Sequence, residues 1–187
     1  MATQTPTQQE TLIPTGSWNV DPVHSTVEFS VRNMGIVNVK GHFREFEGTI
    51  ESDGDLGSVR ARGSVRVASV DTRSEKRDEH LLADDFFDAE NHSQITFEST
   101  RIEPAGDRLR VIGNLTIRGT TREVELDAVV HGPIEDPWGG ERVGIEVTGA
   151  INRLDYGLRW DVKTPGGDRL ASNEVKLELY VGAVKAE

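Results

Sequence analysis

The stretch from Arg108 to His131 places apolar or small residues at every second position in two successive runs. Between the runs lies Arg118-Gly119-Thr120-Thr121, a sequence that favours a tight turn. A period of two on both sides of a turn is typical of a β-hairpin with one buried face. The residues expected on that face are Leu109, Val111, Gly113, Leu115 and Ile117, then Val124, Leu126, Ala128 and Val130.

The same alternation recurs along most of the chain. It covers the segments around 18–20, 27–31, 39–50, 59–67, 95–99, 143–151 and 175–181, with a phase slip at Arg44-Glu45 that a β-bulge would explain. With the hairpin, these segments make about eight or nine strands joined by short turns. Antiparallel strands that close on themselves leave no exposed edge, so an up-and-down barrel is favoured over a sandwich. We therefore expect an all-β fold.

One segment departs from the period of two. Thr72 and Glu75 stand three residues apart, as in the capping box that opens many helices. The residues from 75 to 83 suit about two helical turns. We expect this to be the one short helix of the chain.

Composition limits the class of partner. The 187 residues suffice for one domain with a single sizeable core. With 32 acidic and 21 basic residues, the net charge of -11 repels polyanions, so we expect no nucleic-acid partner. The chain has no cysteine, which excludes disulfides and cysteine-ligated metals. The five histidines form no spacing typical of a metal site, and we expect no metal and no cofactor.

The N-terminal residues differ from the rest in composition. Residues 1–16 are rich in Thr, Gln and Pro, without a positive start or an apolar run. They therefore have the features of neither a signal peptide nor a membrane span. We expect residues 1–15 to be a disordered leader, residues 16–187 to form the barrel domain, and the protein to be cytoplasmic.

Small residues on the expected inner face raise the question of whether the barrel is hollow. Gly63, Gly113, Gly149, Ala61 and Ala128 all fall on that face, and only 6% of the residues are aromatic. A barrel of about eight strands is just wide enough to be filled by its own side chains or to hold one slender ligand. The glycines alternatively permit strand coiling or take a bulky partner opposite. An apolar tunnel and a filled barrel both stay open.

A set of short motifs, in this order, resembles the YceI-like family. They are Trp18-Asn19-Val20-Asp21-Pro22-Val23-His24-Ser25, Gly41-His42-Phe43 with Phe46-Glu47-Gly48, Arg77-Asp78-Glu79-His80-Leu81 with Phe86-Phe87-Asp88, Ile95-Thr96-Phe97-Glu98-Ser99-Thr100, Gly113-Asn114-Leu115-Thr116-Ile117-Arg118-Gly119-Thr120-Thr121 and Ile151-Asn152-Arg153-Leu154-Asp155-Tyr156-Gly157. The resemblance covers nearly everything from Gly16 to Val184. Two departures are the missing signal peptide and Ser93, where the family has a proline.

The resemblance implies an extended, eight-stranded, antiparallel, lipocalin-like β-barrel with an apolar tunnel. It also implies that the tunnel binds a long isoprenoid lipid, such as a polyprenyl pyrophosphate or the tail of a polyprenyl quinone. Burial of apolar surface yields roughly 25 cal/mol per Å², so the tail would supply most of the affinity. The expected role is that of a non-catalytic carrier or sequestering protein.

Alternation and resemblance together nominate the residues that would line such a tunnel. Phe86 and its neighbour Phe87 follow the helix, where they would line the tunnel or plug one end of it. The full set of candidates is Phe29, Val31, Phe43, Val65, Val67, Phe86, Phe97, Leu115, Ile117, Ile145, Val147, Leu177 and Leu179.

Four polar residues are candidates for the barrel mouth or a ligand head group. His24 follows an Asp-Pro turn, which places it near a barrel end or gives it a purely structural role. Arg77 and His80 lie three apart on the expected helix and form a small cationic cluster, unless they are only solvated surface charges. Arg153 has inward parity, so its charge needs a partner such as Asp155 or a ligand head.

Two other classes of function compete with lipid binding. An isomerase or hydrolase acting on an apolar substrate would use His24 or an aspartate at the mouth, although no nucleophile elbow is present. A filled barrel would instead act as an interaction module, with a possible homodimer formed through an outward patch around Val129, Tyr180 and Trp138.

Overall fold

The computed structural model describes residues 13–187, which contain an 11-stranded sheet and one α-helix. The expected all-β barrel with one short helix is therefore confirmed. The elements are β1 (Gly16–Val20), η1 (Pro22–His24), β2 (Thr26–Asn33), β3 (Val37–Phe43), β4 (Phe46–Ser52), η2 (Leu56–Ser58), β5 (Arg60–Arg66), η3 (Val67–Ser69), β6 (Val70–Asp71), α1 (Glu75–Leu82), β7 (Gln94–Ala105), β8 (Arg108–Ile117), β9 (Thr120–Glu135), β10 (Glu141–Asn152), η4 (Arg153–Tyr156) and β11 (Glu174–Lys185).

The predicted leader is only partly within this description. Residues 1–12 of it lie outside the described residues. Ile13 belongs to the fold, since its side chain is buried in the barrel core and its carbonyl accepts a hydrogen bond from the Ser52 hydroxyl at 2.8 Å. The barrel domain thus begins earlier than the predicted residue 16.

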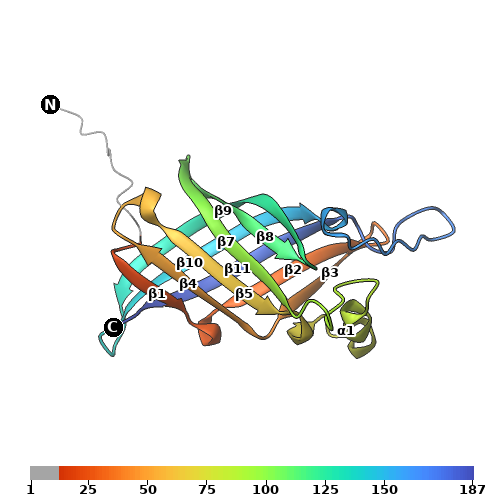
Figure 1. Ribbon diagram of the computed structural model, residues 1–187, viewed down its shortest axis with the longest axis horizontal. Helices are drawn as coiled ribbons and strands as arrows, with labels where there is room; N and C mark the ends of the chain where they lie inside the picture. Colours follow the sequence, from red (N-terminus) through yellow and green to blue (C-terminus); the bar gives the residue numbers. More distant parts are fainter. Residues whose placement is uncertain (1–12) are drawn as a thin grey trace.

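The sheet closes into a ring. Strands pair antiparallel in the order β1-β4-β5-β7-β8-β9-β10-β11, and β1 pairs again with β11 through Trp18 opposite Lys185 (Figure 1). The ring is a closed barrel of eight strands, as the resemblance implied. Strands β2, β3 and β6 extend the same sheet from β11.

The barrel wall consists of eight antiparallel strand positions, which we call staves. Five of them are single strands, and three are each made of two successive strands with an interruption between them. The C-terminal part of β11 pairs with β1 and its N-terminal part with β2, so these two strands form one stave interrupted by η1. In the same way β3 and β4 form one stave and β5 and β6 another, because β2 pairs with β3, β1 with β4 and β3 with β6. Counted by staves, the chain runs up and down around the barrel in sequence order.

The phase slip predicted as a bulge is such a break. Strand β3 ends at Phe43 and β4 begins at Phe46. Between them the Arg44 N–H donates to the Ser69 carbonyl at 3.1 Å, and the Glu45 carbonyl accepts from the Arg66 N–H at 2.9 Å. Between the pairs Phe43–Val70 and Phe46–Val65, residues 44–45 lie opposite the longer segment 66–69, and this unequal count resets the alternation as a bulge does.

The hairpin of β8 and β9 matches the pattern from which it was predicted. Leu109 lies opposite Ala128, and Ile117 opposite Thr120. The turn is tighter than expected, because only Arg118 and Gly119 connect the strands, both with positive φ. Two such residues twist the chain in the sense that a hairpin of right-handed strands needs.

Helix α1 lies at the end of the barrel opposite the C-terminus (Figure 1). Its N-cap is Ser74, whose hydroxyl accepts from the Arg77 N–H at 3.3 Å, and not the predicted Thr72. The Thr72 hydroxyl instead donates to the Asp78 carboxylate at 2.6 Å. The helix is therefore tied back to β6, which immediately precedes it.

Candidate functional site

The inward faces of the strands enclose an apolar cavity of about 280 Å³. It extends along the barrel from Ile13, Leu56 and Val59 at one end to Ile117 and Ile151 near the other. Ten of the thirteen residues predicted to line a tunnel are part of its wall. They are Phe29, Phe43, Val65, Phe97, Leu115, Ile117, Ile145, Val147, Leu177 and Leu179.

The other three candidates are placed elsewhere by the structure. Val31 shares the parity of Phe29 but lies one residue pair beyond the wall, opposite Val39 and Val175. Val67 falls in η3, where β5 has ended, so strand alternation no longer predicts its direction. Phe86 packs against the rings of His80 and Trp160, outside the cavity.

Several residues of the cavity wall were missed by the sequence reasoning. Val27, Ile95 and Val181 share the inward parity of their strands, so the alternation carried enough signal to nominate them. Ile13 and Leu56 had no such signal, because they lie outside regular strands and reach the wall through the tertiary fold.

The small residues on the inner face do not all leave space. A Cβ atom on Gly113 would come within 2.5 Å of the Phe97 ring, and one on Gly149 within 2.4 Å of the Leu126 side chain. At these positions the bulky partner lies over the glycine, as the filled-barrel alternative requires. Gly63 differs, because a Cβ there would meet only the Glu47 carbonyl oxygen, at 3.3 Å, and no side chain within 4 Å. At Gly63 no side chain fills the place that a Cβ would take.

One end of the barrel is closed by a buried cluster of strand residues and of residues just outside the strands. Trp18 is 0% exposed, and its indole N–H donates to the Pro14 carbonyl at 3.0 Å. The same buried cluster includes Ile13, Val59 and Val143. We call this the plugged end; the C-terminus lies here (Figure 1).

The other end is covered by segments outside the barrel strands. Phe87, from the turn after α1, packs edge-on against Phe43 with ring centroids 6.3 Å apart. Next to it, His80 and Phe86 meet Trp160 at centroid distances of 5.6 and 5.2 Å. These contacts join the α1 segment to the loop of residues 157–173, and together the two segments form what we call the lid.

Arg153 holds part of this lid in place. Its side chain is 3% exposed, and the guanidinium donates to the carbonyls of Leu158, Ala171 and Ser172 at 2.6, 3.3 and 3.0 Å. Burial lowers the pKa of Arg153. The partners that satisfy this buried charge are lid carbonyls and the Asn173 side chain rather than the expected Asp155.

Two other head-group candidates are also engaged with protein groups. The Arg77 guanidinium donates to the Thr72 hydroxyl at 2.7 Å and to the Thr72 carbonyl at 2.6 Å. The His80 ring nitrogen Nε2 lies 2.8 Å from an Asp85 carboxylate oxygen. The structure therefore does not bring Arg77 and His80 together as a cationic cluster facing the cavity.

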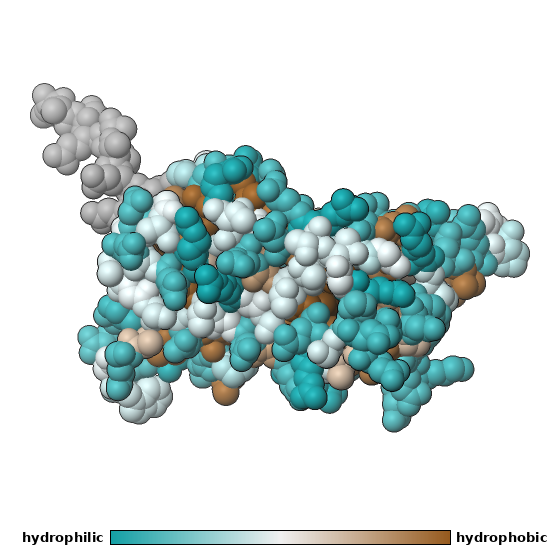
Figure 2. Space-filling view, in the orientation of Figure 1, coloured by the Kyte–Doolittle hydropathy of each residue, from teal (hydrophilic) through white to brown (hydrophobic). Residues whose placement is uncertain are grey.

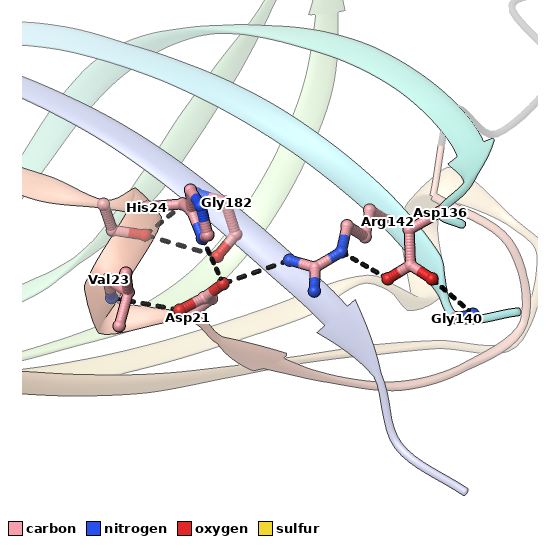
Figure 3. Close-up of polar contacts among 8 residues, drawn as sticks. Asp21, Val23, His24, Asp136, Gly140, Arg142 and Gly182 are labelled. Atoms are coloured by element: carbon pink, nitrogen blue, oxygen red, sulfur yellow. Dashed lines mark hydrogen bonds and ion pairs between the residues drawn. The ribbon is translucent and has the colours of Figure 1, made fainter. Parts of the chain in front are cut away.

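His24 lies on the outer surface of the barrel and not at a mouth. The η1 turn leaves the strand ladder at this point, which turns the ring outward, where Nδ1 is 2.7 Å from Asp21 Oδ2. Asp21 also accepts from Arg142 at 3.0 Å, and Arg142 donates to Asp136 at 2.6 Å (Figure 3). The hydrogen bonds from His24 and Arg142 lower the pKa of Asp21 to about 2.

The outward patch proposed for a homodimer is divided. Val129 and Tyr180 lie on neighbouring outer positions, but Glu146 on β10 is opposite both of them. Trp138 is 85% exposed in the turn between β9 and β10.

Over residues 13–187, no three or more His, Asp or Glu side chains form a group that could hold a metal ion. None of the helices in the same range has the length and apolar character needed to cross a membrane.

Comparison with known proteins places this barrel in a family. The profile described as YceI-like domain matches residues 18–183. A UPF0312 protein of Serratia proteamaculans is 36% identical over 165 residues, which cover 88% of this chain and 83% of that protein. Burkholderia cenocepacia BcnA has the same fold, with a TM-score of 0.75 at 23% identity over 87% of this chain and 98% of that one.

A second solved structure shares the fold at lower identity. It is a polyisoprenoid binding domain from Saccharophagus degradans, described as implicated in plant cell wall breakdown, with a TM-score of 0.70 at 15% identity. That match covers 90% of this chain and 98% of the other. The profile match over most of the chain and the identity to the Serratia relative agree with the barrel geometry: this chain belongs to the YceI-like family.

Proposed function

We propose that this protein binds a long isoprenoid lipid in the barrel cavity and acts as its carrier or sequestering protein. The observation that carries the proposal is the apolar cavity along the barrel axis, whose wall includes residues from both broken and continuous staves. An apolar chain buried there gains roughly 25 cal/mol per Å² of surface removed from water. The Saccharophagus degradans domain supports the proposal to the extent that a barrel of this fold accommodates such a chain.

The plugged end and the lid give the proposed ligand a direction. Trp18 of β1 and Ile13, which precedes that strand, are buried in one cluster at one end, so the tail would point toward them. The head group would lie at the lid, where Phe87 and Trp160 come from non-strand segments. Since Arg77 and Arg153 already donate to protein carbonyls, the structure favours an uncharged head, as on a quinone, over a pyrophosphate.

The volume sets a condition on binding. Ligand pockets commonly measure about 300 to 1,000 Å³, and this cavity of about 280 Å³ lies at the lower limit. A long chain would therefore require side chains at the lid to move outward. Phe87 is suited to this, because its ring is half-buried and attached to a turn.

The first test is native mass spectrometry of the purified protein, followed by lipid extraction. We expect a bound mass that extracts as a polyprenyl quinone or polyprenyl phosphate. A protein that carries no lipid and takes up no added isoprenoid would contradict the proposal and return attention to a filled barrel.

A matched pair of variants then tests the site itself. Val147→Trp fills the cavity from β10, and Leu115→Trp does so from β8. We expect either change to weaken isoprenoid binding by about tenfold or more, since a bulky side chain in the cavity excludes ligand atoms. The control is Val129→Trp, the same substitution on the outward face of the neighbouring strand. Equal affinity in all three variants would remove this cavity from consideration.

A further inference from the structure

The lid end of the barrel carries exposed apolar side chains that the cavity does not use. Ile36 is 70% exposed and Val37 is 52% exposed, both at the turn between β2 and β3. Met34 in the same turn and Val162 in the 157–173 loop are also exposed. We call these four residues the apolar tip. Exposing several large apolar side chains to water is unfavourable, and such groups mark sites of interaction.

The two segments that form the tip are bonded to each other. The Asn33 side-chain amide donates to the Leu170 carbonyl at 2.8 Å, and the Ser172 N–H donates to the Arg32 carbonyl at 3.0 Å. Ser172 and its neighbour Ala171 also accept from Arg153, the residue that holds the lid. The apolar tip and the lid are therefore one connected unit.

The charge around the tip differs from that of the whole chain. Residues 32–40 and 157–173 contain five basic and two acidic residues, whereas the chain has a net charge of -11. One of the acidic residues, Asp161, pairs with Arg169 at 3.1 Å and Lys163 at 4.0 Å. Within the same segments, the Arg32 guanidinium donates to the Gly35 carbonyl and the Asn38 side chain. The tip thus combines apolar groups with a local excess of positive charge.

The shape of the molecule allows the tip to make contact first. The 157–173 loop extends beyond the barrel along its long axis, while α1 lies to one side (Figure 1). The α1 segment is acidic, with seven acidic and two basic residues over 75–90. Hydrophobic surface is visible among hydrophilic side chains at this end in Figure 2. Screening over about 8 Å at physiological ionic strength limits how far the acidic segment opposes contact by the tip.

From these observations we infer that the apolar tip docks on the surface of an anionic lipid bilayer. Ile36, Val37 and Val162 enter the head-group region, and the basic residues beside them contact lipid phosphates. The inference rests on the proposed function. An isoprenoid lipid dissolved in a membrane would reach the cavity through the lid, and the tip adjoins the lid.

The plugged end offers an internal contrast. Ile134 is 63% exposed there, close to the level of Ile36, near the end of β9 and opposite Arg142 of β10. Its surroundings lack the local excess of positive charge, because the three acidic residues of 134–141 outnumber the two cations that pair with them, Arg142 with Asp136 and Lys185 with Glu141. An anionic surface would therefore attract this exposed apolar group less than it attracts the tip. Ile134→Asp is therefore a matched control for Ile36→Asp.

The test is co-sedimentation of lipid-stripped protein with vesicles that contain no isoprenoid. Vesicles of equal parts phosphatidylglycerol and phosphatidylcholine are compared with pure phosphatidylcholine vesicles at an ionic strength of about 0.15 M, where the acidic α1 segment is screened. We expect wild type and Ile134→Asp to bind the anionic vesicles, Ile36→Asp to bind them about tenfold or more weakly, and high salt to weaken binding by wild type. No wild-type binding to anionic vesicles, or unchanged binding by Ile36→Asp, would overturn the inference.

A second readout separates this inference from the proposed function. The same three proteins are titrated in solution with a short isoprenoid alcohol, such as farnesol, in the absence of vesicles. We expect equal binding by all three, because neither substitution touches the cavity wall. Loss of farnesol binding in Ile36→Asp alone would show that this change damages the cavity, and the docking inference would then lose its support. If none of the three binds farnesol while vesicle binding persists, the cavity proposal fails and the docking surface stands.

Discussion

The two ends of this barrel are closed in different ways. At the plugged end the closing side chains belong to strands or to residues bonded directly to them, and Trp18 is fully buried. At the lid end the closing rings of Phe87 and Trp160 come from a turn and a loop, and they remain half-buried. A residue in a strand can move only if the backbone hydrogen bonds to the neighbouring strands break or move with it, whereas a residue in a loop can move without them. The difference assigns stability to one end and access to the other.

The largest effect is expected at the plugged end. Trp18→Ala leaves a large void in a packed cluster, which typically costs about 3–5 kcal/mol of unfolding free energy. Urea denaturation followed by circular dichroism measures it. Trp138→Ala is the control, because that indole is exposed and its removal should change stability by less than about 0.5 kcal/mol. Similar losses of unfolding free energy in both variants would show that burial of Trp18 does not contribute specially to the stability of the barrel.

A smaller and more local effect is expected for Arg153→Leu. This change removes the donor from three lid carbonyls. An unsatisfied buried group costs about 1–3 kcal/mol, but the loop can turn toward water and recover part of that, so we expect about 2 kcal/mol. Hydrogen exchange should accelerate over residues 157–173 and stay unchanged in β1 and β11. Uniform acceleration along the chain would mean that the lid is not a separate unit.

Phe87→Ala should affect ligand kinetics more than stability. The half-buried ring packs edge-on against Phe43, so its loss should cost about 1 kcal/mol or a little more. Because the ring packs on Phe43, which lines the cavity, release of a bound isoprenoid should be several-fold faster in stopped-flow displacement. Phe86→Ala is the comparison, since that ring faces Trp160 outside the cavity. Faster release in Phe86→Ala than in Phe87→Ala would reverse their assigned positions.

The smallest expected effect concerns pH and the carboxylate of Asp21 on the outer surface. The pKa of Asp21 is lowered from its usual 3.8 to about 2, first by the hydrogen bond from His24 and then by that from Arg142. A carboxylate with a lowered pKa stabilises the folded state above its unfolded pKa and loses that contribution as pH falls through the folded value. The relevant window is therefore pH 4 down to 2.

Asp21→Asn removes this contribution. At neutral pH the variant should be less stable by no more than about 1 kcal/mol, because the pairing is at the surface. The deficit should shrink as the pH is lowered from 4 to 2, as measured by thermal unfolding. A deficit that stays constant over this window would mean that the Asp21 charge does not contribute.

The strands and the segments that interrupt them were not equally predictable from the sequence. The alternation along the strands predicted the inward faces and ten residues of the cavity wall, because period two has a direct geometric meaning in a strand. The same reasoning misplaced Val67, since nothing in a local pattern shows where η3 interrupts β5. Val31 was misplaced for another reason. Its side chain has the inward parity, but where the cavity ends along β2 depends on packing between distant segments.

Polar candidates were predicted least well. Arg153 has the inward parity that nominated it, yet two of its three carbonyl partners lie about twenty residues further along, and no spacing rule connects them. His24 was expected near a barrel end because it follows a turn, but that turn interrupts a stave midway. Local sequence indicates that a charge needs a partner, and only the closed fold decides which partner it finds.

The pairing of β1 with β11 has one more consequence. Trp18 lies opposite Lys185, so the beginning and end of the described barrel are neighbours in a continuous ladder. In a ring of up-and-down staves the place where the backbone is cut is arbitrary. A circular permutant that joins the two termini and opens the exposed turn at Trp138 would keep every stave next to its present neighbours. The architecture is cyclic although the gene that encodes it is linear.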